Sequence, residues 1–573
     1  MKSISTLLKK YSKTSEFKIS KNKEFKNICV LGFGPWSQAT YFPIFFGSKQ
    51  ASKHSISEGV AKKAFAGDIG IKLPLIIDMI SNKKKIDDFL EKNKFKQIGS
   101  TELTTIWERG NNKLHLYLIP KPKIQSKIDL NINKNIISLI NKFNIKGVII
   151  ATVPVTHKAY STLALENGIS VFLEKPITTS INATYSLEKA DDIYKDYEQL
   201  REIYIKAKKK FPNISFSVQS QRRFHPYYRL FKELVREVTK ETGLPITSIE
   251  TTHSGGAWVT PWEWLDDENP ANSYGQGFGK VSHTGYHDID IQQYLLAGSY
   301  GSSQNEKLFD KISTYARFLM PIDINKQFTP DEQGKLLKGK HTKKNVKNSY
   351  LSKSGEVEAR VMIELSRNNH IKTNITLNML NYAMSSRSWA SQGKRSSYAH
   401  HGRIRWEKII IRQGYLQTIE YTETRSGDDQ AQITVYRNPL VTTKEWGEHT
   451  HYTTEKLNYK KNKRKIWYAA RTGGVRELAQ NLHGMLPSDK MTSDFLTHDI
   501  SVIVMRDIYK SGKRDYGTLT KNMPCAITTY PFKKSIKKRK QKKKKRKTQK
   551  KKKKKHNKSP KPLVQSRSLS LSQ

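Results

Sequence analysis

The sequence of 573 residues is poor in cysteine and has no long apolar run. Its two cysteines, Cys29 and Cys525, provide neither a disulfide framework nor the spacing of a cysteine metal site. Nowhere do about 18 apolar residues follow one another, and the N-terminal residues lack the apolar stretch of a signal peptide. These absences predict a soluble protein without a transmembrane segment, located in a reducing cytoplasm.

Acidic residues are missing from the C-terminal end. Residues 533–573 contain 21 Lys or Arg and no Asp or Glu, whereas the preceding residues carry 81 basic and 51 acidic side chains. We predict a disordered basic tail there, because the segment has too few apolar residues to build a core. Such a tail binds polyanions non-specifically, and it has no aromatic side chain to stack on bases. Alternatively, it is a solvated end without a selected partner.

The chain is longer than one hydrophobic core supports, which predicts at least two domains. After a polar, flexible leader (1–24), strands alternate with helices over 25–176, a pattern typical of a parallel α/β sheet. Beyond Pro176, segments with an apolar residue at every second position predict an open, mainly antiparallel sheet in a second α/β domain over 177–532. Residues 326–354 are rich in Lys and Gly and predict an inserted loop.

A short apolar strand ends at Gly32-Phe33-Gly34 and is followed by an apolar-periodic segment. A glycine turn between a strand and a helix is typical of dinucleotide binding, with Pro35 tolerated in the first helical turn. The third glycine of the usual motif is Ser37 here, so a tight turn without a ligand is the alternative. Asp78 ends the next strand and is a candidate ribose ligand, although it follows Gly32 by 46 positions instead of about 20.

Two further groups of residues carry candidate chemistry. The strand "VFLEKPIT" ends on Glu174-Lys175-Pro176, which would place a charged pair at the sheet edge where ligands bind; a surface salt bridge is the alternative. In "SHTGYHDID", His283, His287 and Asp290 have the i, i+4, i+7 spacing of one helix face. Two histidines at this spacing can hold a metal, but no third ligand follows at a suitable distance, so we predict no metal site.

In this order, the motifs resemble those of the Gfo/Idh/MocA oxidoreductases. The segment "VIIATVPVTHKAYSTLALENGISVFLEKPIT" is similar to the stretch of that family that ends in its E-K-P signature. The matching residues there are Ala151, Thr152, Pro154, His157, Gly168, Glu174, Lys175 and Pro176. Downstream, Gly285, His287 and Asp290 match the family's D-x-G-x-H-x-x-D segment, and Arg223, Phe224 and Pro226 match a strand end.

The resemblance implies a Rossmann domain followed by an α/β domain whose open sheet is often an oligomer interface. It also implies NAD(P)-dependent hydride transfer at a carbinol carbon of a sugar, cyclitol or related polyol, with NAD slightly favoured by Asp78. Lys175 would polarise the reacting oxygen, and His287 would be the general acid/base, with His283 beside it. The expected cofactor-binding residues are Gly32, Gly34, Pro35, Trp36, Asp78, Thr152, Pro154, His157, Glu174 and Lys175. The expected substrate-binding residues are Arg223, His253, Trp258 and Asp290.

The sequence departs from the family pattern at one position. His283 replaces the acidic residue that stands four positions before the family's histidine, and an imidazole cannot support a neighbouring imidazolium by charge. Two alternatives therefore stay open: a non-catalytic, NAD(P)-binding regulatory protein of the same fold, and an NAD-dependent, glycosidase-like activity.

Overall fold

The computed structural model describes residues 24–47, 61, 63–120, 128–255, 273–299, 308–327, 332, 348–381, 405–425, 429–514 and 525–529. The predicted tail, Trp258, nearly all of the predicted leader and most of the predicted 326–354 insertion lie outside the described residues. Within the described part, no helix is long and apolar enough to cross a membrane.

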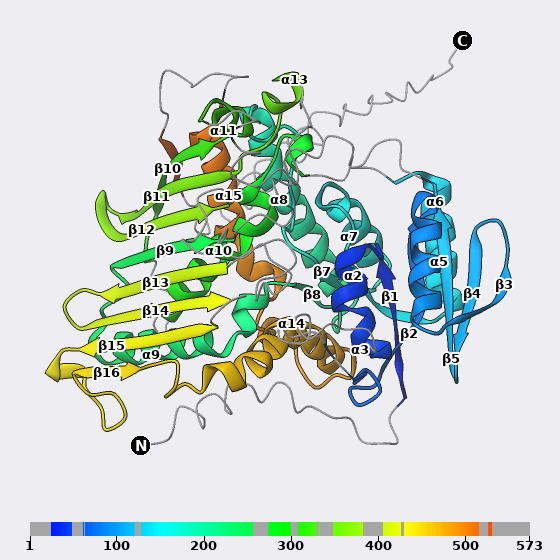
Figure 1. The fold of residues 1–573 in the computed structure, drawn as a ribbon, viewed down its shortest axis with the longest axis horizontal. Helices are drawn as coiled ribbons and strands as arrows, with labels where there is room; N and C mark the ends of the chain where they lie inside the picture. Colours follow the sequence, from blue (N-terminus) through cyan, green and yellow to red (C-terminus); the bar gives the residue numbers. More distant parts are fainter. Residues whose placement is uncertain are drawn as a thin grey trace, which may run out of the picture.

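The first of two sheets has eight strands and contains the glycine turn (Figure 1). In spatial order they are β3 (Lys96–Ser100), β4 (Thr104–Arg109), β5 (Asn112–Ile119), β2 (Ile71–Met79), β1 (Lys26–Leu31), β6 (Ile145–Ile150), β7 (Ser170–Leu173) and β8 (Phe216–Val218). All neighbours from β5 to β8 are parallel, in the doubly wound order of a Rossmann sheet. The order reverses between β1 and β6, where such sheets bind ligands.

Helices cover both faces of this sheet, because its central strands are buried on both sides. On one face lie α6 (Leu130–Lys142), α7 (His157–Glu166) and α8 (Leu187–Lys210). On the other lie α2 (Pro35–Thr40), α3 (Phe42–Phe46), α5 (Lys83–Lys92) and the distant α14 (Tyr459–Leu482). Two elements beyond residue 176 thus belong to this part of the fold, since β8 is a strand of the first sheet and α14 packs against it.

The second sheet has nine strands and is mainly antiparallel, as the alternating segments predicted. Its spatial order is β16 (His449–Tyr452), β15 (Gln430–Arg437), β14 (Gln417–Arg425), β13 (Arg405–Gln413), β9 (Ser248–Ser254), β12 (His370–Leu380), β11 (Glu358–Arg367), β10 (Lys311–Leu319) and β17 (Ala526–Thr529). Only β9 and β12 pair in parallel among these described strands. Side chains on β14 alternate between buried and half-exposed, so one face is covered and the other open.

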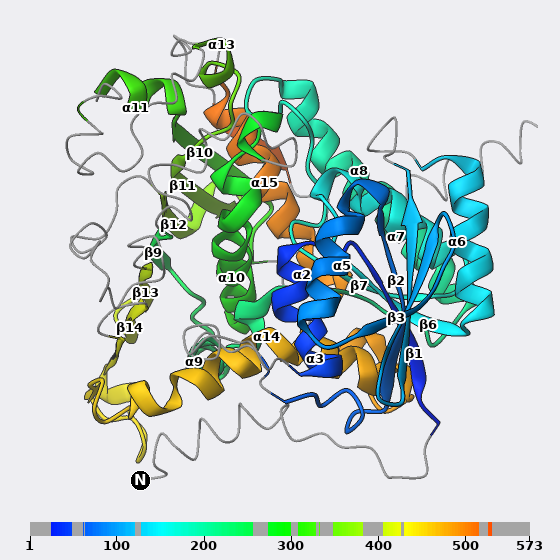
Figure 2. The ribbon, with the colours of Figure 1, turned by 45° about the vertical axis from the view of Figure 1, so that its right-hand side comes forward.

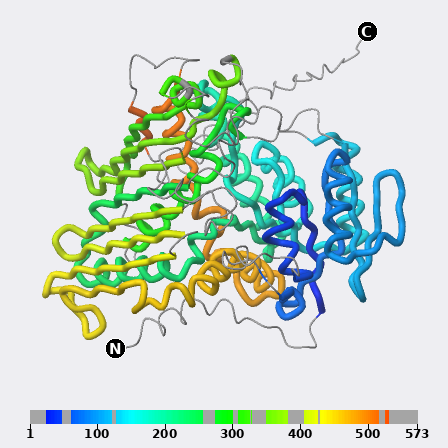
Figure 3. The backbone as a smooth tube through the Cα atoms, in the orientation of Figure 1, coloured from blue at the N-terminus to red at the C-terminus, as the bar shows by residue number. Residues whose placement is uncertain are grey.

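Helices fill the space between the two sheets (Figure 2). They include α9 (Pro226–Thr242), α10 (Tyr286–Leu296) and α15 (Asp499–Gly512), while the short α11 (Pro321–Gln327) and α13 (Asn348–Leu351) lie near the end of β10. Figure 3 shows α14, in gold, running from the yellow strands of the second sheet to the blue elements of the first. Helix α15 ends at Gly512.

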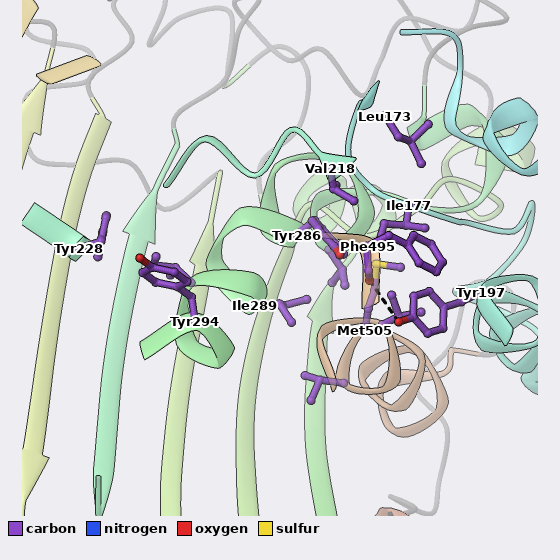
Figure 4. Close-up of a cluster of buried hydrophobic side chains, with 14 of the residues drawn as sticks. Leu173, Ile177, Tyr197, Val218, Tyr228, Tyr286, Ile289, Tyr294, Phe495 and Met505 are labelled. Carbon is purple, nitrogen blue, oxygen red and sulfur yellow. Dashed lines mark hydrogen bonds between the residues drawn. The ribbon is translucent and has the colours of Figure 1, made fainter. Parts of the chain in front are cut away.

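One hydrophobic core joins the two sheets (Figure 4). Leu173 at the end of β7 and Val218 at the end of β8 lie in this core, together with Tyr286 of α10. Phe495 stacks on Phe216 and on Tyr197, with ring centroids 4.2 Å and 4.7 Å apart. Because a close-packed core resists displacement, it fixes the end of β7 relative to the start of α10. These two elements carry the main candidate residues.

Candidate active site

The glycine turn lies at the reversal point of the first sheet. Gly32 has φ +88°, and a Cβ on it would lie 2.7 Å from the carbonyl oxygen of Ala151 at the end of β6. Only glycine fits there, since both the backbone conformation and the close approach exclude a side chain. Ser37, in place of the third glycine, donates a hydrogen bond to the Gly32 carbonyl at 2.7 Å. The serine thus closes the turn upon itself.

Asp78 lies beside this turn, at the end of β2. Its carboxylate accepts hydrogen bonds from the backbone N–H of Phe33, from that of Met79 at 2.6 Å and from the Asn82 amide at 2.7 Å. Apart from Gly34 itself and the adjacent chain, no described residue has an atom within 4 Å of the position that a Cβ on Gly34 would take. The open space at Gly34 and the carboxylate at the strand end are the features that a dinucleotide requires, so the residues present fit this cofactor.

Glu174 is buried and holds the end of β7 to the helix that follows the glycine turn. Its Oε1 accepts a hydrogen bond from Trp36 Nε1 at 2.6 Å and another from the Tyr41 hydroxyl. Burial raises the pKa of Glu174, while the nearby charge of Lys175 opposes that rise. Glu174 is thus a buried structural residue that links β7 to the segment after the glycine turn, and it is not part of a surface salt bridge.

His157 is also a brace, since its ring is fully buried. Nδ1 lies 2.8 Å from the carbonyl oxygen of Pro176, and Nε2 lies 3.1 Å from that of Thr152. Burial lowers the pKa of His157 to about 4, so the ring is neutral at pH 7. It ties the Lys175–Pro176 peptide, which is cis, to the end of β6, where Thr152 and Pro154 are half-buried.

Lys175 reaches from the first sheet to the element that precedes α10. Its Nζ donates a hydrogen bond to the carbonyl oxygen of His283 at 2.5 Å. Burial lowers the pKa of Lys175, whereas the charges of Glu174 and Asp288 raise it. The structure thus brings together the lysine and the histidine segment, which lie about a hundred residues apart in sequence.

His283 and His287 do not share one regular α-helix. Val281–Gly285 forms a π-helical turn, and α10 begins only at Tyr286, so the i, i+4 geometry expected from the sequence is altered. π-Helical turns of this kind occur often at functional sites. Gly285 is required within the turn, because a Cβ there would overlap the sulfur of Met379 and lie 2.8 Å from the Lys280 carbonyl oxygen.

His287 is 8% exposed, and one of its ring nitrogens is buried without a hydrogen-bond partner among the described residues. Its Nε2 lies 3.3 Å from the side-chain nitrogen of Gln221, while Nδ1 has no hydrogen-bond partner within the described part of the chain. Burial lowers the pKa of His287 well below its usual value, and the positive charges of Lys175 and Arg222 lower it further. His287 is therefore neutral at pH 7, the form that accepts a proton.

Asp288 is a buried acid that the sequence analysis did not single out. It pairs with Arg222 and lies 3.1 Å from Nδ1 of His253, and Arg222 also contacts Glu407 at 3.2 Å. Burial raises the pKa of Asp288, but Arg222 and His253 lower it more, so the carboxylate is charged. The one signal for it was an acid directly after His287. His253 is 6% exposed, and burial lowers its pKa to about 4.

Arg223 and Asp290, expected to bind substrate, are almost completely buried and pair with each other. Arg223 donates to both carboxylate oxygens of Asp290, at 2.9 Å and 2.6 Å. Asp290 also lies 2.9 Å from Nδ1 of His498, whose Nε2 lies 2.9 Å from the Ser493 hydroxyl. This serine–histidine–aspartate chain is inaccessible, with 0% exposure at all three residues. We therefore interpret Arg223 and Asp290 as structural residues.

Within the described residues, no group of three or more His, Cys, Asp or Glu side chains could hold a metal ion.

Comparisons with known proteins agree with this fold. Residues 81–204 match the model of the Gfo/Idh/MocA oxidoreductase family with an NAD-binding Rossmann fold. No curated protein matches the chain.

Many solved structures are similar to this chain, among them the following three. An oxidoreductase from Agrobacterium radiobacter in complex with NAD+, L-tartaric acid and magnesium is 12% identical, with 85% of this chain and 96% of that chain covered and a TM-score of 0.45. An oxidoreductase domain protein from Kribbella flavida is 11% identical, covering 88% and 100% with a TM-score of 0.48. A myo-inositol dehydrogenase from Corynebacterium glutamicum is 13% identical, covering 85% and 96% with a TM-score of 0.42. Likenesses this distant carry no argument about activity. By its motifs and by the match of residues 81–204 to the family model, this chain is similar to the Gfo/Idh/MocA oxidoreductases.

Proposed function

We propose that this protein is an NAD-dependent dehydrogenase or reductase that acts on a carbinol carbon of a sugar, cyclitol or related polyol. The observation that carries the proposal is that Lys175, at the carboxyl end of β7, contacts the turn that precedes His287. The amine of Lys175 is held by the His283 carbonyl, and its charge lowers the pKa of His287.

The protein side of the reaction is a proton transfer. In the oxidative direction, the Lys175 ammonium donates a hydrogen bond to the substrate hydroxyl oxygen, and neutral His287 accepts the proton from that oxygen. The C–H bond breaks as the C=O bond forms, and its electron pair leaves with the hydrogen. The nicotinamide ring, when bound, accepts or donates this hydride. In the reductive direction, His287 returns the proton to the carbonyl oxygen.

The cofactor would be held by residues at the ends of β1, β2, β6 and β7. The turn at Gly32 and Gly34, with Pro35 and Trp36, would receive the pyrophosphate, and Asp78 the adenosine ribose. A carboxylate at Asp78 favours NAD, because it would repel the additional phosphate of NADP. Thr152, Pro154 and Glu174 would border the nicotinamide half, with His157 supporting them from within the core.

Binding and turnover together test the proposal. Calorimetric titration of the full-length protein with NAD and NADP should show tighter binding of NAD to the wild type, with similar NAD affinity in Lys175→Ala and His287→Ala. A panel of polyols should then reveal NADH formation by the wild type and a loss of at least about 100-fold in both variants.

Exposed residues supply the matched controls: Lys189→Ala and His449→Ala should retain wild-type rates. If the wild type binds neither nucleotide, the dehydrogenase proposal fails. If it binds NAD without turnover on any polyol or ketose, the proposed substrate class fails and a regulatory role replaces it.

A further inference from the structure

The glycine turn supplies few groups that favour an anion. Pro35 has no backbone N–H, the third glycine is replaced by Ser37, and the helix that follows, α2, has only six residues and no acidic or basic side chain in its end turns. A pyrophosphate carries two negative charges that need compensation in a partly buried site. The turn therefore calls for a positive charge from elsewhere in the fold.

Helix α14 packs closely against β7 because of two adjacent glycines. A Cβ on Gly474 would overlap the ring of Phe172, which lies on β7 two residues before Glu174. A Cβ on Gly473 would overlap the ring of Phe224. Glycine disfavours helix interiors, so the pair is explained by this close approach to the strand ends. The Gln219 side chain fixes the same segment by donating to the Arg471 carbonyl at 2.9 Å.

Arg471 extends from this part of α14 towards Trp36, in the helix that follows the glycine turn. Its side chain is 7% exposed, and its guanidinium carbon lies 5.7 Å from the centroid of the Trp36 ring. Trp36 is the second residue after Gly34 and donates its indole N–H to Glu174. A guanidinium is always charged and binds phosphate oxygens in a bidentate manner. Arg471 is thus a cation beside the turn, contributed by a helix some 430 residues further along the chain.

We infer that Arg471 binds the pyrophosphate of the dinucleotide cofactor and that α14 completes a cofactor site otherwise built from the first sheet. This inference rests on the proposed function, because it concerns the same cofactor. It adds a residue that neither the glycine motif nor the E-K-P signature indicates. It also explains why α14 carries glycines at the point of closest approach.

The test compares ligands with and without the pyrophosphate. Full-length wild type and Arg471→Gln are titrated with NAD, ADP-ribose and adenosine. Binding of adenosine, the weakest of the three ligands, is followed by the loss of NADH fluorescence as it displaces bound NADH. We expect Arg471→Gln to weaken NAD and ADP-ribose by a similar factor of about 10 to 100, and to leave adenosine within about twofold. The salt dependence of NAD binding should also decrease in the variant, since one phosphate contact is lost.

Arg476→Gln is the matched control on the same helix. Arg476 is also buried, but its guanidinium lies 4.0 Å from the Phe65 ring centroid and donates to the Tyr468 hydroxyl. The Arg476→Gln variant should bind all three ligands as the wild type does, and Arg471→Lys should bind NAD with intermediate affinity.

Two results would overturn the inference: unchanged NAD affinity in Arg471→Gln, or an equal loss for adenosine and ADP-ribose, which would show a purely structural role. A melting temperature for each variant identifies misfolding, and in that case Arg471→Lys decides by the same comparison of ligands. Failure of the wild type to bind NAD would overturn the proposed function itself, which is a different outcome.

Discussion

The ammonium group of Lys175 is held by the backbone carbonyl of His283, 2.5 Å away. The contact joins the last residues of β7 to a π-helical turn, where the widened geometry alters the backbone hydrogen bonding of an α-helix. Lys175 therefore recognises the backbone at position 283 and not its side chain. The replacement of the family's acid by His283 leaves this contact intact, because every residue has a carbonyl group.

His283 should consequently be tolerant of substitution. We expect His283→Asp, which restores the family's acid, to raise the pKa of His287, because a carboxylate would favour its charged form. The lower limb of the pH–rate profile should move to higher pH, while NAD affinity stays within about twofold. The profile is measured from kcat/KM between pH 5 and 9, with His283→Asn as a neutral control. Identical profiles for the three proteins would show that position 283 has no electrostatic effect on His287.

Gln221 should position the ring of His287. The amide lies 3.3 Å from Nε2, and the side-chain oxygen of Gln221 has no partner within the described residues. Rotation of the amide by half a turn lets this oxygen accept Nε2–H, which leaves the lone pair on Nδ1 free to accept a proton. Gln221→Leu should therefore lower kcat about tenfold or more with little change in NAD affinity.

The conservative variant distinguishes positioning from packing. Gln221→Glu retains an acceptor and adds a charge that favours the imidazolium, so it should recover part of the rate and shift the pH profile upwards. If Gln221→Leu and Gln221→Glu lose the same activity at every pH, Gln221 acts only through packing.

Much of the first sheet was predictable, because strands buried on both faces appear as continuous apolar runs, as in β1 and β6. The β3–β4 hairpin was missed, since such short segments have little periodicity. Helix α14 was missed because its first half is polar and its middle contains Gly473 and Gly474, which lower helix propensity. Its helical state is established by packing against distant side chains, which no local pattern records.

The candidate site was predictable only where motifs have a fixed spacing. Glu174, Lys175 and His287 were predicted from the motif order and stay predictions, whereas Asp288 and Arg471 could be proposed only from their tertiary placement. Arg223 and Asp290 show that a motif match does not establish exposure, since these two charged residues matched the motif but form a buried pair. A sequence pattern indicates that residues matter, but burial decides whether they contact a ligand or the core.

His157 should make stability dependent on pH. Its pKa falls from 6.5 in the unfolded chain to about 4 in the fold, so the unfolded state binds more protons between these values. The contribution of His157 to stability is thus lost as the pH falls from about 6.5 to 4. The destabilisation caused by His157→Gln should shrink by up to about 1.4 kcal/mol per pH unit over this window.

Urea unfolding of wild type and His157→Gln at pH 7, 6 and 5 measures this difference. His449→Gln, an exposed histidine, should show a constant difference from the wild type across the same range. A destabilisation by His157→Gln that stays constant with pH would show that folding does not change the pKa of His157. One that grows as the pH falls would show that the ring is protonated in the fold, bonded to both carbonyl oxygens.

Glu477 on α14 should contribute to the pH dependence of stability with the opposite sign. Burial raises the pKa of this carboxyl to about 7, while hydrogen bonds from the side chain and backbone of Thr492 oppose the rise. The folded state therefore binds more protons than the unfolded state between about pH 4.5 and 7, and the stability that this provides is lost as the pH rises through that window. Glu477→Gln cannot ionise and keeps an acceptor for Thr492. Its stability relative to wild type should increase by up to about 1.4 kcal/mol per pH unit from pH 5 to 7.

Chemical unfolding at these pH values measures the gain in stability. Glu198→Gln, in the half-exposed ion pair with Arg201, is the control.

Since Glu477 lies on the helix that carries Arg471, the Glu477→Gln variant also shows whether α14 limits cofactor binding. If ionisation of Glu477 loosens the helix, NAD affinity of the wild type should weaken between pH 6 and 8 while that of Glu477→Gln remains constant. If NAD affinity decreases equally in both proteins, the pH dependence comes from another group. The packing of α14 then does not depend on the charge of Glu477.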